Sequence, residues 1–73
     1  MKKYFLKSNG YNLIAFVINN KMVVLDCETL EEAKNMNTEG IDGMEDIEEV
    51  ANYVNKEVYD FNPSEWENVT ELI

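Results

Sequence analysis

The sequence predicts an α+β fold, in which a three-stranded antiparallel β-meander packs against one main amphipathic helix with short flanking helices. Asn9-Gly10, the strongest short hairpin signal, lies between stretches rich in β-branched and aromatic residues. Thr29-Leu30-Glu31-Glu32 has the pattern of a helical capping box. Apolar residues then recur at helical spacing over residues 43–58. With 73 residues in total, we expect residues 1–73 to form a single small acidic domain.

The meander is expected in the first third of the chain. Its strands are predicted at residues 3–7, 12–18 and 22–27, with turns at Asn9-Gly10 and Asn19-Asn20-Lys21. A type I′ turn needs positive φ at both central positions, which Asn and Gly adopt most readily.

The middle strand of the predicted meander is apolar on both faces. Its two alternating sets of side chains are Ile14, Phe16, Ile18 and Leu13, Ala15, Val17. A strand of this kind is usually covered on both sides. We therefore expect either that both faces are covered within the monomer, which we favour, or that one face meets a partner.

Three helices are expected after the meander. The first begins after Thr29 and runs to about residue 36, and a loop follows at residues 37–43. The main helix is predicted at residues 43–58, with Asp42 as its N-cap and Glu45 in its first turn. Its inward stripe is Met44, Ile47, Val50, Ala51, Val54 and Val58.

The C-terminal segment allows two interpretations. Asn62-Pro63 is typical of a helix start, because proline at the first helical position loses no hydrogen bond. A short helix would turn Trp66, Val69 and then Leu72 or Ile73 inward. In the alternative interpretation, residues 68–73 form a late strand.

The composition limits the catalytic and metal-binding chemistry open to the chain and indicates its cellular location. The chain lacks histidine, the usual general base and commonest metal ligand, and has one cysteine. Residues 13–18 form its longest apolar run, far shorter than a membrane helix, and residues 1–7 are too short for a signal peptide. The use of lysine without arginine, with ten asparagines, suggests a low-GC bacterium or its phage. We expect a cytoplasmic protein of the bacterial host cell, with no membrane contact.

No enzymatic constellation is apparent, and we expect no catalytic residue, cofactor or metal. Asp26 and Glu28 flank Cys27 and should raise its thiol pKa, so Cys27 is expected to be a small core residue. The carboxylates at Asp42, Glu45, Asp46 and Glu49 lack the spacing of a calcium loop.

Charge is the most informative feature of the sequence. The net charge is −9, and residues 26–73 contain all 15 acids against Lys34 and Lys56. Direct nucleic-acid binding is disfavoured, because phosphate contacts need clustered cations. A stripe of acids instead suits a basic partner. The expected partner-binding residues are Glu45, Asp46, Glu48, Glu49, Asn52, Tyr53, Glu57, Glu65 and Glu67. For Tyr53, packing at the edge of the core or under the C-terminal segment is the alternative.

The chain resembles the small acidic anti-CRISPR proteins of phages and mobile elements in size, charge and layout, without a shared motif. The features that carry the resemblance are the meander at residues 3–27, the acidic helix with Glu45, Asp46, Glu48, Glu49 and Glu57, and the acidic tail at residues 60–71. The resemblance implies a DNA-mimicking inhibitor whose acids occupy the basic nucleic-acid channel or PAM-reading site of a Cas nuclease complex. The alternative is a small protein–protein interaction module without an inhibitory role, either antitoxin-like or homodimeric through the sheet.

Overall fold

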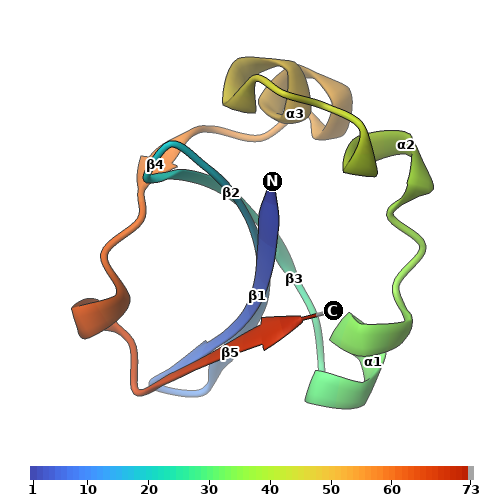
Figure 1. Cartoon of the computed structure of the whole chain (residues 1–73). Coiled ribbons are helices and arrows are strands. Elements are labelled where there is room, and N and C mark those ends of the chain that lie inside the picture. Colours follow the sequence, from blue (N-terminus) through green and yellow to red (C-terminus); the bar gives the residue numbers. More distant parts are fainter. Residues whose placement is uncertain (73) are drawn as a thin grey trace.

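A five-stranded antiparallel sheet lies at the centre of the computed structural model, which describes residues 1–72, and its strand order is β4-β3-β2-β1-β5. Three helices cover one face of this sheet, and the connection from β4 to β5 crosses the opposite face (Figure 1). The strands are β1 (Lys2–Ser8), β2 (Tyr11–Ile18), β3 (Lys21–Asp26), β4 (Tyr59–Asp60) and β5 (Asn68–Leu72). The helices are α1 (Leu30–Asn35), α2 (Glu39–Asp42) and α3 (Ile47–Val54), with one 3₁₀ turn, η1 (Pro63–Glu65).

The predicted meander is confirmed, with its strands shifted by one residue at several ends. Asn9 and Gly10 have φ values of 47° and 82°, and Asn19 and Asn20 have 52° and 63°. Ser8 pairs with Tyr11 and Ile18 with Lys21, so each turn has two central residues. Lys21, expected in the turn, therefore begins β3.

The sheet has two more strands than predicted. β5 pairs with β1, which confirms the late-strand interpretation of the C-terminal segment, whereas the predicted helix is reduced to the single turn η1. β4 pairs with β3 through Tyr59 and Asp60 only. These pairings join residues distant in sequence, so local patterns carry little sign of them. Leu72 is buried and Trp66 half-buried, but Val69 is exposed; Ile73 lies outside the described residues.

The first helix follows the capping box. The hydroxyl of Thr29 accepts a hydrogen bond from the Glu32 N–H at 3.0 Å. The Glu32 carboxylate accepts the N–H of Glu28, at 3.3 Å, in place of the N–H of Thr29 that a strict capping box would use. Ala33 is buried on the inner side of α1.

The main helix is shorter than predicted: α3 covers residues 47–54, not 43–58. Asp46, not Asp42, is its N-cap, and its carboxylate accepts the Glu48 N–H at 3.0 Å. The helix ends because Asn55 takes a left-handed conformation, and the Lys56 N–H then donates to the Ala51 carbonyl at 3.0 Å. The predicted helix extended too far at both ends because Met44 and Val58, which flank α3, also pack against the core.

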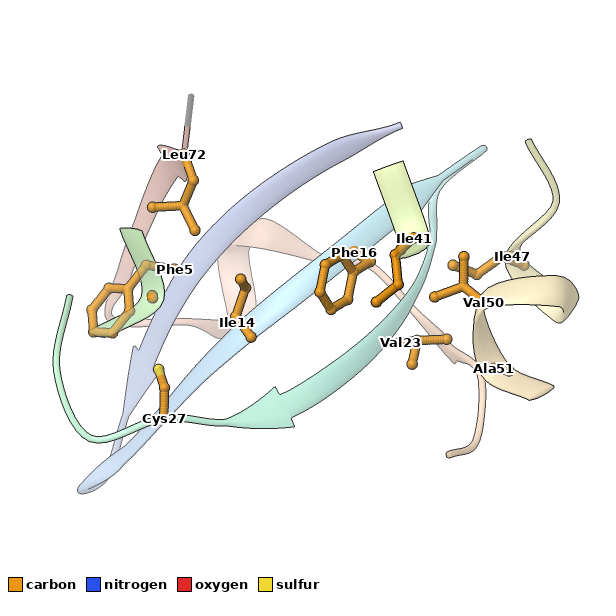
Figure 2. Packing of buried hydrophobic residues seen from close by; sticks show 11 residues of the cluster. Phe5, Ile14, Phe16, Val23, Cys27, Ile41, Ile47, Val50, Ala51 and Leu72 are labelled. Atoms are coloured by element: carbon orange, nitrogen blue, oxygen red, sulfur yellow. The ribbon is translucent and has the colours of Figure 1, made fainter. Parts of the chain in front are cut away.

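Both faces of β2 are covered within the chain. The larger core lies between the sheet and the helices (Figure 2) and consists of Phe5, Ile14, Phe16, Val23, Cys27, Ala33, Ile41, Ile47, Val50, Ala51 and Leu72. On the opposite face, Leu6, Ala15 and Met22 are buried beneath a thinner cover that contains Phe61 and Trp66. The ring of Phe61 stacks on Tyr4 with 5.0 Å between centroids.

The left-handed residue at the end of α3 gives a test of how this helix stops. Asn55→Ala should lower the free energy of unfolding by about 1 kcal/mol, because alanine is strained at positive φ. Asn55→Gly should match or exceed the wild type, because glycine adopts this conformation freely. Urea denaturation measures both variants, and an alanine variant as stable as the glycine variant would contradict this helix end.

The thin second core gives a test of its own. Leu6 is fully buried on that face and its cross-strand neighbour Val69 is 37% exposed. Leu6→Ala should cost about 2–5 kcal/mol, and Val69→Ala markedly less. Urea denaturation measures both variants. Equal decreases in the free energy of unfolding would show that the segment crossing this face excludes little water.

Candidate functional site

The helical side of the molecule holds most of the negative charge. We call residues 27–58, which contain the three helices, the helical layer; it carries ten of the 15 carboxylates and only Lys34 and Lys56. All ten of these carboxylate residues are exposed. The helical layer therefore presents a net charge of −8 to solvent on one side of the sheet.

The carboxylates gather most closely around the start of α3. Ile47, Val50 and Ala51 are buried against the sheet, so the intervening residues face outward. We call this outward set the α3 patch: Glu45, Asp46, Glu48, Glu49, Asn52 and Tyr53, all exposed.

Local physics explains only part of this acidity. Asp46 caps α3, while Glu48 and Glu49 lie in its first turn, where the helix dipole favours negative charge. The ion pairs among residues 1–72 are Lys3–Asp42, Lys21–Asp60 and Lys34–Glu31. None of them involves the α3 patch, so its charge is available to a partner.

Tyr53 provides the large side chain of the α3 patch. The residue is 62% exposed, yet the outer end of its ring lies directly over Gly40 of α2. A Cβ atom at Gly40 would lie 2.9 Å from the Tyr53 Cζ atom, so the absence of a side chain there leaves room for the ring. Tyr53 is thus largely exposed, and the outer end of its ring contacts α2.

The remaining predicted binding residues lie elsewhere. Glu57 follows α3, and its carboxylate accepts a hydrogen bond from the Tyr59 hydroxyl at 3.3 Å. Glu65 and Glu67 belong to the segment that crosses the opposite face of the sheet, where the Glu67 carboxylate accepts the Asn9 N–H at 3.2 Å. The structure therefore places six of the nine predicted residues in the α3 patch, leaves Glu57 beyond the end of α3, and separates Glu65 and Glu67 from the patch.

A polar triad that the sequence did not indicate fixes α2 to the sheet. The Lys3 ammonium donates to the Thr38 hydroxyl at 3.0 Å and to the Asp42 carboxylate at 3.3 Å. Thr38, which is buried, donates to the same carboxylate at 2.9 Å. The hydrogen bond from Thr38, together with that from Lys3, lowers the pKa of Asp42. The four-residue spacing of Thr38 and Asp42 fits one helical turn, but nothing in the sequence pairs them with Lys3.

Cys27 is a buried residue of the larger core. Burial raises the pKa of its thiol, and the nearby carboxylates of Glu32 and Asp26 raise it further. The expected direction is thus confirmed, although Glu32 takes the place of Glu28. Within residues 1–72, no three side chains of the metal-ligating types gather into a possible metal site. The same part of the chain has no helix long and apolar enough to span a membrane.

Comparisons with protein-family models, curated proteins and solved structures gave no match for this chain. The charge, exposure and packing of its own residues are therefore the features that indicate its function.

The triad gives a test that depends on pH. Because folding lowers the pKa of Asp42, its carboxylate stabilises the fold above the ordinary pKa of about 4, and this contribution is lost as the pH falls through the folded-state value. Asp42→Asn should therefore be less stable than the wild type near neutral pH, and the difference should shrink below about pH 4.

Urea denaturation at a series of pH values measures this difference. Asp26→Asn is the matched control, because the Asp26 side chain makes no hydrogen bond or ion pair within the described residues. A stability difference between Asp42→Asn and the wild type that stays constant with pH would show that the charged form of Asp42 does not stabilise the fold.

Proposed function

We propose that this protein is a non-enzymatic inhibitor that binds a basic nucleic-acid-handling protein by nucleic-acid mimicry. The observation that carries the proposal is the concentration of unpaired carboxylates on the helical layer, above all in the α3 patch. Complementary charge speeds encounter between proteins and selects among partners.

The charge density of the helical layer suits this role. The longest dimension of the domain is 28 Å, and duplex DNA of that length carries about 16 phosphate charges, of which about half face any one side. Within that dimension the helical layer offers ten carboxylates, of which eight lie outside the ion pairs of the described residues. A protein groove lined with lysine and arginine would therefore meet a similar number of negative charges on either ligand.

The fixed backbone positions of these acids support mimicry over diffuse attraction. Asp46 is held by its bond to the Glu48 N–H, and the helix itself fixes the spacing of Glu48 and Glu49. Tyr53 adds contact area beside them at low entropic cost, as tyrosines do at binding hot spots. A preorganised anionic surface loses less entropy on binding than a flexible acidic tail.

A Cas nuclease complex is the first target to test, because the chain resembles small acidic anti-CRISPR proteins. Such effectors hold nucleic acid in basic channels and read the PAM with arginine. Addition of this protein to a guide-loaded effector should prevent cleavage of target DNA, and the inhibition should weaken as salt is raised.

The decisive variant reverses two charges of the α3 patch. Glu48→Lys/Glu49→Lys should abolish target binding, because it replaces attraction by repulsion at the centre of the proposed interface. Affinity capture from the host lysate at low and high salt measures this, with nucleic-acid-binding proteins expected among the proteins captured by the wild type.

The matched control is Asp26→Lys/Glu71→Lys. It changes the net charge by the same amount, and neither carboxylate belongs to the helical layer or to an ion pair within the described residues. Its positions lie at the end of β3 and on β5, away from the α3 patch (Figure 1). This control should retain the partner; equal loss in both variants would show that net charge, and no particular surface, drives the binding.

A further inference from the structure

A groove lies on the sheet face opposite the helical layer, on either side of Trp66. One part, of about 450 Å³, has Leu13, Val24, Tyr59, Asp60, Glu65 and Trp66 in its lining. The other part, of about 360 Å³, is lined by Ser8, Asn9, Tyr11, Leu13, Glu65 and Trp66. Leu13, Glu65 and Trp66 border both parts, so we treat them as one site, the Trp66 groove.

The apolar surface of the Trp66 groove is incompletely covered. Tyr11 and Tyr59 border it and are 68% and 50% exposed. Leu13, Val24 and Trp66 remain only half-buried, although they pack on the second core. Exposed apolar and aromatic surface of this kind, rimmed by polar groups, is typical of a binding site.

The unpaired charge around the groove is negative. Glu65 forms part of its wall, and Asp26 flanks it because Asp26 is the cross-strand partner of Leu13. Asp60 contributes a third carboxylate, which pairs with Lys21. Neither Glu65 nor Asp26 is in an ion pair within residues 1–72. The nearest lysine on this face of β1, Lys2, lies at the far end beside Phe61.

We propose that the Trp66 groove binds a cationic amphipathic peptide segment of another protein. The apolar side chains of that segment would pack on Leu13, Val24 and Trp66, and its lysine or arginine side chains would meet Glu65 and Asp26. A cation close to Trp66, Tyr11 or Tyr59 also gains attraction from the aromatic ring face. This site is separate from the α3 patch and does not depend on the proposed mimicry.

A second copy of this chain fits the groove poorly. The chain carries −9, and the same face of the second copy would bring Glu65 and Asp26 near their own counterparts in a two-fold arrangement. Like charges set against each other at an interface disfavour that pairing. A partner with apolar anchors and positive flanks satisfies both properties of the groove at once.

The intrinsic fluorescence of the chain tests this proposal, because Trp66 is its only tryptophan. The probe is a short peptide of alternating lysine and leucine. Its addition should shift the Trp66 emission to shorter wavelength in a saturable way, because the leucines exclude water from the indole ring. Peptides in which serine replaces leucine, or glutamate replaces lysine, should give no such shift.

Two single charge reversals locate the binding. Glu65→Lys should weaken peptide affinity by about tenfold, since it removes a charge pair and adds repulsion, while Glu48→Lys on α3 should change it little. Equal effects of both reversals, or an equal shift with the serine peptide, would overturn the proposal. A concentration-dependent dimer in sedimentation that Glu65→Lys strengthens would assign the groove to a second copy and overturn it as well.

Discussion

The two-sided apolar character of β2 is the constraint on which the rest of the structure depends. Ile14 and Phe16 project toward the helices, and Ala15 toward the opposite face, and all three are buried. A chain of this length can bury both faces of the sheet only if nearly all of its remaining segments serve as covers. The helical layer provides one cover, and the segment from β4 to β5 provides the other.

The two covers differ in kind, and the proposed functions follow from that difference. The helical layer seals its face with an apolar stripe and turns its acids outward, which concentrates negative charge on one side. The second cover consists chiefly of Phe61 and Trp66 and is too narrow for the face it crosses. It therefore leaves an apolar groove. The molecule thus presents an anionic surface and an apolar surface back to back.

Short sequence patterns correctly predicted the structural features that depend only on adjacent residues. The two Asn-containing turns and the Thr29 cap were correct, because positive φ and capping are properties of a few adjacent residues. The predicted ends of the main helix were wrong, because Met44 and Val58 keep helical spacing while lying outside the helix. Three other features depend on contacts between residues that are distant in sequence. They are the strand β4, the position of Glu65 and the contact of Lys3 with Thr38. Sequence periodicity does not report such pairings, and for this reason the predicted acidic surface proved to be divided between two faces.

The proposed mimicry requires that the α3 patch and nucleic acid compete for the same cationic surface of the partner. The most direct measurement is native gel electrophoresis of the purified partner with labelled duplex DNA and increasing amounts of this protein. Under the proposed mimicry, DNA should be released as the protein binds, and no species should contain both ligands. A stable ternary complex of partner, DNA and this protein would contradict it.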